Sequence, residues 1–267
     1  MKPEFDSSGW GKMPVPGHWQ LNGFGYPHYN DAISLFPILE RPAVQIDNPT
    51  GAYRHFFRVE KDEEKEYLLR FDGVESAYHV WLNGTFVGYS QGSRLSAEFD
   101  VTDCLRSGEN LLAVKVYKFC EGSYLENQDM WWFSGIIRDV ALLARPRVHL
   151  ADYQLDCGLT ADGEKGILNA SFCVENGDGK EKELILAIRL FREETAVLCR
   201  ELKLCAASGE KRELKLEEKI EEIRQWSAEQ PFLYRMEMVL KDAQEDRIVE
   251  VYAEEVGFRR VELKNGR

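Results

Sequence analysis

Hydrophobic and polar positions alternate in short runs along most of the chain, which is the period-two pattern of β-strands. The clearest example lies at 78–82 and 85–89, two runs joined by Asn83 and Gly84. Asn-Gly favours a tight hairpin turn because both of its central positions need a positive φ. These residues therefore predict a β-hairpin.

Further runs of the same kind extend the β prediction over both halves of the chain. Pro146 interrupts them, and since proline cannot donate to a central ladder we expect a domain boundary there. Expected strands lie at 96–101, 111–117 and 136–143 before the proline, and at 148–156, 166–175, 182–191, 196–204, 213–220, 233–240 and 248–254 after it. Short strands with regular turns beyond residue 146 predict an immunoglobulin-type sandwich.

Helical signals are scarce, which excludes several fold classes. The stretch 217–226, rich in Glu, Lys and Ile, is the one that resembles a helical turn. A (β/α)₈ barrel needs about 250 residues and eight amphipathic helices, and those helices are absent. The glycine-rich phosphate-binding motifs and the H-E-x-x-H zinc motif are also absent. The sequence predicts an all-β protein.

Composition adds a domain count and narrows the partners. The chain has 267 residues, enough for two domains, and 44% hydrophobic with 30% charged residues is ordinary for a globular protein. The net charge of −12 disfavours nucleic acid and anionic membrane surfaces as partners. Neutral sugars remain compatible, although the charge is also explained by solubility alone.

The cysteines and the N-terminus bear on the cellular compartment. The six cysteines have neither C-x-x-C nor zinc-finger spacing, so we expect reduced thiols, several of them in the core. An even number would also permit disulfides in a secreted protein. The N-terminus has no signal-peptide pattern and no stretch approaches 18 apolar residues, so a cytoplasmic location is expected.

The segment 122–135 is the candidate for chemistry. It lies between two expected strands and should be a loop, polar at one end and aromatic at the other. Trp131 and Trp132 follow Asp129 closely, a combination that suits sugars because aromatic faces stack on their apolar faces. Asp129 can accept a hydroxyl proton or ligate a hard cation. From the residues alone, tryptophans that fill an interface with another domain are favoured over a sugar site.

A series of motifs, in a fixed order along the chain, resembles the family 2 glycoside hydrolases. They are VPGHWQ (15–20), NPTGAY (48–53), FDGVESAY (71–78), WLNG (81–84), VGYSQGSRL (87–95), SYLENQDMW (123–131) with SGIIRDV (134–140), WSAEQPFLY (226–234) and VGFR (256–259). Each is weak alone, whereas together they are specific. The run around Asp129 is similar to the version in large bacterial β-galactosidases, more than to that in β-glucuronidases or β-mannosidases.

The resemblance implies a domain organisation. It predicts a jelly-roll sugar-binding domain at 1–145, shortened at its N-terminus, an immunoglobulin-like sandwich at 146–259, and at 260–267 the start of a linker into a TIM barrel that this chain lacks. Retaining glycosidases of this family use two carboxylates about 5 Å apart, both glutamates on that barrel.

The resemblance also implies a function. We expect the non-catalytic part of a homo-oligomeric β-galactosidase, which removes terminal non-reducing β-D-galactose from β-galactosides such as lactose with retention. No catalytic residue is expected in this chain, and the isolated chain should be inactive. A freestanding carbohydrate-binding module and a purely structural assembly element are the alternatives.

The resemblance assigns site residues. Asp129 corresponds to an aspartate that binds a sodium ion and the galactose 6-hydroxyl, with the rest of the sodium shell on the barrel. The family's Y-x-N sugar contact falls on Tyr29-Asn30-Asp31, so Asn30, Asp31 or neither takes that role. Gln91 and Glu121 align with a peripheral magnesium site.

Overall fold

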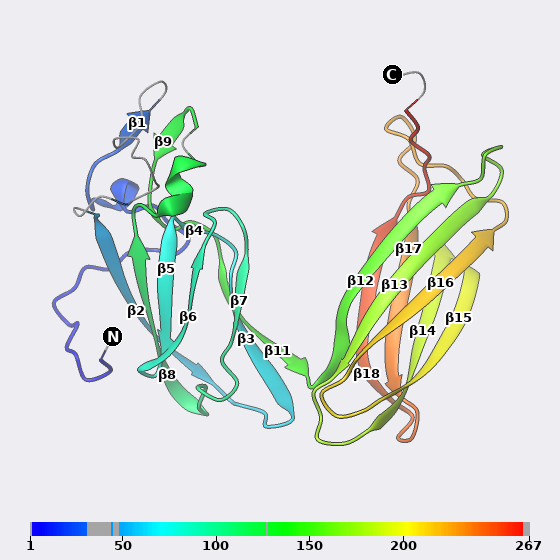
Figure 1. Ribbon diagram of the computed structural model, residues 1–267, viewed down its shortest axis with the longest axis horizontal. Helices are drawn as coiled ribbons and strands as arrows, with labels where there is room; N and C mark the ends of the chain where they lie inside the picture. Colours follow the sequence, from blue (N-terminus) through cyan, green and yellow to red (C-terminus); the bar gives the residue numbers. More distant parts are fainter. Residues whose placement is uncertain (1, 31–43, 45–47, 127, 264–267) are drawn as a thin grey trace. The chain divides into compact units, whose positions relative to one another are not determined.

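A computed structural model of the chain describes residues 2–30, 44, 48–126 and 128–263. It divides into two compact units, Met1–Arg145 and Pro146–Arg267. Apart from two short 3-10 helices, every described element is a strand, which confirms the all-β prediction (Figure 1). Within the described ranges, neither helix has the length and apolar character that a membrane span requires.

The first unit is a sandwich of two antiparallel sheets with smaller ladders at one end. The sheets have the strand orders β2-β8-β5-β6 and β11-β3-β7, and the pairs β1-β9 and β10-β4 are separate two-stranded ladders. The elements are η1 Gln20–Asn22, β1 His28–Asn30, β2 Thr50–Val59, β3 Lys65–Phe71, β4 Val74–Glu75, β5 Ala77–Leu82, β6 Thr85–Gln91, β7 Ala97–Asp100, β8 Gly108–Tyr117, η2 Glu121–Tyr124, β9 Met130–Trp132, β10 Gly135–Ile136 and β11 Val140–Pro146.

The core of the first unit follows from the alternation within its strands. In β5, Val80 and Leu82 are buried, while His79 and Trp81, which alternate with them, are only half-buried. The predicted hairpin is confirmed, because β5 and β6 pair across a turn in which Asn83 and Gly84 have φ values of 53° and 86°. Burying large apolar side chains on one face of each sheet supplies the main driving force for the sandwich.

The second unit is a sandwich of three and four antiparallel strands, in the orders β12-β13-β16 and β15-β14-β17-β18 (Figure 1). Its strands are β12 Val148–Leu159, β13 Gly166–Asn176, β14 Lys182–Arg192, β15 Thr195–Ala206, β16 Lys211–Ile220, β17 Tyr234–Asp242 and β18 Arg247–Val256. Alternate residues of β13 and β14, such as Leu168 and Leu186, are fully buried between the sheets. The expected strands beyond residue 146 are thus confirmed.

Two local expectations are wrong. The stretch 217–226 is not helical, since β16 runs to Ile220 and pairs with β13, and a turn with Glu222 at φ 53° follows. The expected single strand 136–143 is divided into β10 and β11. The backbone N–H groups of Ile137 and Arg138 leave the sheet there and donate to the carbonyl of Gly73, at 3.0 and 3.2 Å.

All six cysteines are unpaired in the structure. Cys120 is buried, Cys104 and Cys157 pack against the edges of the two cores, and Cys199 and Cys205 are exposed. The sequence predicts several cysteines in the core, whereas Cys120 is the one that the structure buries.

Candidate functional site

The segment between β8 and β11 has more regular structure than the loop that the sequence predicts. A 3-10 helix, η2, begins it, and Ser123 closes the first turn by accepting the backbone N–H of Cys120 at 3.0 Å. A three-residue strand, β9, then carries Met130, Trp131 and Trp132. The aromatic half of the segment is therefore held in a ladder, which fixes the directions of its side chains.

The partner of β9 is β1, about 100 residues earlier in the chain (Figure 1). Tyr29 is paired with Trp131 and Asn30 with Met130. The hydroxyl of Tyr29 donates a hydrogen bond to the carboxylate of Asp129. The structure therefore brings together the two segments in which sugar contacts are predicted, and it places the backbone of Asn30 next to the position after Asp129. Asp31 lies outside the described residues.

The two tryptophans have different environments. Trp132 is fully buried and its ring contacts Phe119, with 6.0 Å between centroids. Trp131 is 53% exposed and lies between Tyr29 and Phe133, with centroid distances of 5.3 and 6.2 Å. Trp132 thus packs inside the first unit, whereas Trp131 is left accessible for contacts with a ligand or with another domain. We call Tyr29, Asp129, Trp131 and Phe133 the platform.

The chemistry of the platform suits a neutral polyol. The rings of Trp131 and Phe133 are nearly parallel, 12° apart, and give an apolar surface against which a sugar face can stack. Asp129 is exposed at its edge and can accept hydroxyl protons. An apolar surface with a few fixed polar groups is the general composition of small-ligand sites.

The platform is anchored on its inner side by the turn at residues 93–94. The carboxylate of Glu126 accepts the backbone N–H of Ser93 at 3.0 Å and its hydroxyl at 2.5 Å. Arg94 contacts the sulfur of Met130 at 3.5 Å, and its own carbonyl accepts a hydrogen bond from Arg138 at 2.8 Å. These contacts hold both ends of the short stretch that carries Asp129.

Glu75 is the residue of this region that sequence reasoning missed. It is 3% exposed, and its Oε1 has no hydrogen bond, although the guanidinium of Arg94 lies 3.7 Å away. Burial raises the pKa of Glu75 to about 7, the charge of Arg94 lowers it, and the charge of Glu126 raises it further. Nothing in its motif marks Glu75 as buried, because strand β4 has only two residues.

The two residues aligned with a peripheral magnesium site lie near Tyr89. Gln91, at the end of β6, accepts the Tyr89 hydroxyl at 3.2 Å. Burial raises the pKa of Tyr89, as do the nearby Cys120 and Glu121. In the part of the chain that the structure describes, no group of three or more His, Cys, Asp or Glu side chains is placed to hold a metal ion.

The number of oxygen ligands matters for the predicted sodium site at Asp129 and for the predicted magnesium site at Gln91 and Glu121. A hard cation takes about six oxygen ligands. Asp129 would supply one carboxylate to a sodium shell, and Glu121 and Gln91 would supply a carboxylate and an amide oxygen to a magnesium shell, so the described residues would supply only part of either. The donor type fits these ions, whereas the number of donors does not complete either site.

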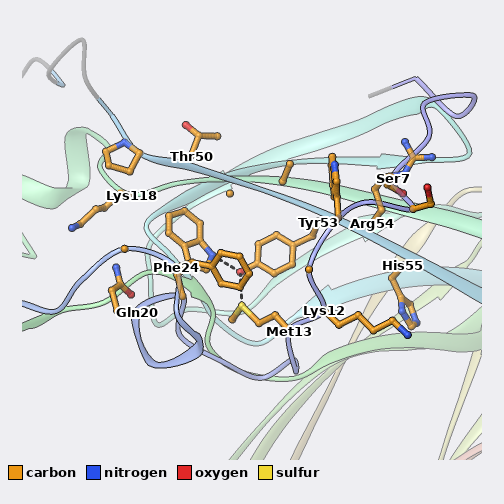
Figure 2. A pocket seen from close by; sticks show the side chains of 18 of the residues that line it. Ser7, Lys12, Met13, Gln20, Phe24, Thr50, Tyr53, Arg54, His55 and Lys118 are labelled. Carbon is orange, nitrogen blue, oxygen red and sulfur yellow. Dashed lines mark hydrogen bonds between the residues drawn. The ribbon is translucent and has the colours of Figure 1, made fainter.

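A hollow of about 1000 Å³ lies elsewhere on the first unit, between the N-terminal segment and β2 (Figure 2). Tyr53 is at its centre, accepts a hydrogen bond from the indole of Trp19 and contacts the sulfur of Met13 at 3.9 Å. Burial raises the pKa of Tyr53. The platform residues do not line this hollow. We place the candidate site at the platform because exposed rings beside a carboxylate are found there.

Comparison with known families identifies the family of both units. Residues 6–146 match the family model described as "Glycosyl hydrolases family 2, sugar binding domain". Residues 148–259 match the model described as "Glycosyl hydrolases family 2". The chain belongs to glycoside hydrolase family 2, and the resemblance found in its motifs is confirmed.

Curated relatives narrow the similarity to one activity. A β-galactosidase of Enterobacter cloacae is 40% identical over 259 residues, a match that covers 95% of this chain and 25% of the relative. A β-galactosidase of Pectobacterium atrosepticum is 41% identical over 265 residues, with the same coverage. The chain therefore spans about a quarter of the length of the curated relatives it matches.

Solved structures share the fold. A β-glucuronidase from Bacteroides uniformis superposes with a TM-score of 0.81 at 22% identity, covering 96% of this chain and 30% of that one. A family 2 glycosyl hydrolase from Bacteroides cellulosilyticus gives 0.72 at 23% identity, covering 96% and 33%. At these identities the likeness concerns the fold alone.

Proposed function

We propose that this chain is the sugar-contacting, non-catalytic part of a β-galactosidase that cleaves terminal β-D-galactose with retention. The observation that carries the proposal is the β1–β9 ladder, which joins Tyr29 to Asp129 and leaves Trp131 exposed beside them. The β-galactosidase relatives at about 40% identity support the choice of galactosides.

In this proposal each platform residue has a defined task. Trp131 stacks on the apolar face of galactose, and Asp129 accepts the proton of the 6-hydroxyl. The Tyr29 hydroxyl holds the Asp129 carboxylate in place. A bound sodium ion would order the same hydroxyl by charge, with Asp129 as one of its oxygen ligands. The second sugar contact, expected of Asn30, of Asp31 or of neither, stays a prediction.

Bond cleavage is assigned to other domains of the parent enzyme. Retaining hydrolysis needs a nucleophile and an acid/base, two carboxylates about 5 Å apart across the glycosidic bond. We assign neither role to this chain, and we expect the parent to be a homo-oligomer that acts in the cytoplasm. Its magnesium site would include Gln91 and Glu121.

Calorimetry with lactose and galactose tests the binding claim. We expect dissociation constants in the millimolar range, about −4 kcal/mol, because one platform buries only part of a sugar. Asp129→Ala should abolish the heat of binding. Asp103→Ala, an exposed carboxylate elsewhere on the first unit, is the matched control. Unchanged binding in Asp129→Ala would remove this residue from the site.

Incubation with a chromogenic β-galactoside tests the assignment of catalysis. The purified chain should release no chromophore above the rate of a blank. Hydrolysis that persists through contaminant controls would show that a catalytic pair lies within these residues.

A freestanding carbohydrate-binding module is the second candidate, favoured by the fact that all four platform residues lie on the first unit. The two functions differ in affinity. A complete binding module should hold lactose at micromolar rather than millimolar concentration, which the same calorimetry would show.

A further inference from the structure

Three contacts tie the stretch 126–135, which carries most of the platform, to one small region of the first unit. The carboxylate of Glu126 accepts a hydrogen bond from the hydroxyl of Ser93, and the sulfur of Met130 contacts the guanidinium of Arg94. Gly135 pairs with Glu75 in the β10–β4 ladder. The three attachment points, Glu75, Ser93 and Arg94, adjoin one another through the Glu75–Arg94 ion pair. The order of the platform therefore depends on this region.

Glu75 is subject to two opposing charges, the cation of Arg94 and the carboxylate of Glu126. Among the described residues, the charged side chains that act on Glu75 are Arg94, with 3.7 Å between Nη2 and Oε1, and Glu126. Arg94 is 45% exposed, whereas Glu75 is 3% exposed. Arg94 can therefore turn into solvent, while Glu75 cannot leave its place. The Nη2 of Arg94 lies 3.7 Å from Oε1 of Glu75 and 3.5 Å from the sulfur of Met130, so the charge on Glu75 acts on the same group that contacts Met130.

We propose that Glu75 is a positioning residue, which in its ionised form holds Arg94 against Met130 and so orders the platform for its ligand. The proposal deepens the proposed function, since the ligand in question is the galactoside. Glu75 touches no ligand itself and acts through Arg94. The neutral form of Glu75 leaves Arg94 without its ion-pair partner and the platform less ordered.

The state of Glu75 changes close to neutral pH. Burial raises its pKa to about 7, so the side chain is mostly protonated at pH 6 and mostly ionised at pH 8. Local order of the platform should therefore increase between these values. Global stability should change in the opposite direction, because an ionised buried carboxylate disfavours the folded state. A purely structural role of Glu75 would make both quantities fall together.

Amide hydrogen exchange, measured by mass spectrometry on the intact chain at pH 6 and pH 8, tests the proposal. The readout is the protection of a peptide covering residues 128–133, corrected for the intrinsic effect of pH. In the wild type, protection should rise about threefold from pH 6 to pH 8, the size of a partly exposed ion pair. Glu75→Gln should remove this rise. Arg94→Gln should give low protection at both pH values.

Glu98→Gln, which changes an exposed glutamate on β7, is the control and should keep the rise. Circular dichroism establishes that each variant is folded. The proposal is overturned if protection in the wild type does not rise, if Glu75→Gln retains the rise, or if Arg94→Gln leaves protection unchanged. Lactose calorimetry on the same samples is a separate measurement. Absence of lactose binding would contradict the proposed function, while the exchange result would still decide the role of Glu75.

Discussion

Two carboxylates, one in each unit, are equally buried and behave in opposite ways. Asp242 in the second unit and Glu75 in the first are both 3% exposed. Burial raises the pKa of Asp242, but hydrogen bonds from the backbone of Glu245, from Lys182 and from the backbone of Gln244 outweigh it, and the pKa is lowered overall. Glu75 has an Oε1 without a hydrogen bond, and its pKa is raised to about 7.

The comparison separates a structural carboxylate from a functional candidate. A buried carboxylate loses its hydration, and hydrogen bonds must offset that loss; both oxygens of Asp242 accept such bonds, whereas Oε1 of Glu75 accepts none. The second unit is two sheets joined by turns, and its buried acid closes one of those turns. The first unit has two small ladders in addition to its sheets, and its buried acid belongs to one of them, β4–β10, next to the platform.

The largest expected effect comes from removing the bonded carboxylate. Asp242→Ala should lower the free energy of unfolding by about 3 kcal/mol at pH 7, because three partly buried donors, on Lys182, Gln244 and Glu245, lose their acceptor. Since the folded-state pKa of Asp242 is lowered, its contribution is present above the unfolded value of 3.8 and is lost as pH falls through the folded-state pKa. Denaturant titration measures the loss. An equal loss in Asp156→Asn, an exposed residue on β12, would contradict it.

Replacing Glu75, the carboxylate with an unbonded oxygen, should raise the free energy of unfolding and not lower it. Glu75→Gln should raise the free energy of unfolding at pH 8 by up to about 3 kcal/mol, the value of a pKa shift from 4.5 to about 7. The folded-state pKa is raised, so wild-type stability is fully present below pH 4.5 and is lost as pH rises through 7. The gain should shrink toward zero near pH 4.5. Denaturant titrations across this range measure it, and a gain independent of pH would disagree with the assignment.

A smaller effect is expected at the anchor of Glu126. Ser93→Ala removes the hydroxyl that donates to this carboxylate and should lower the free energy of unfolding by about 1 kcal/mol. The backbone N–H of Ser93 still donates to Glu126, so the anchor is weakened and not lost. Thermal unfolding measures the change. Ser107→Ala, an exposed serine that accepts one backbone N–H, offers the comparison.

The smallest effect on stability is expected at the exposed carboxylate. Tyr29→Phe removes the hydroxyl that donates to Asp129 and should change the free energy of unfolding by less than about 0.5 kcal/mol. Under the proposed function the same change should weaken lactose binding several-fold, because the carboxylate is no longer held. Calorimetry and thermal unfolding on one sample separate the two effects. A loss of stability with unchanged lactose binding would show that the Tyr29–Asp129 hydrogen bond supports the fold and not the ligand.

Local sequence patterns predicted most of the strands correctly, but they failed where long-range pairing decides the structure. The Asn83-Gly84 turn and the alternation in β5 act over a few residues, so the hairpin could be predicted. The stretch 217–226 has the composition of a helix, yet β16 is a strand because its backbone pairs with β13 and Leu216 and Ile220 enter the core. Long-range pairing there overrides the local preference.

The sequence by itself determined the all-β class, most of the strands of both sandwiches and the family, and it singled out Asp129 with its neighbouring tryptophans as the candidate site. Only the tertiary structure decided which tryptophan is buried, that Tyr29 is the partner of Asp129, and that Glu75 lies buried beside Arg94. The physical reason is range. Alternation and turns are set by neighbours in sequence, whereas burial and pairing between β1 and β9 depend on segments about 100 residues apart.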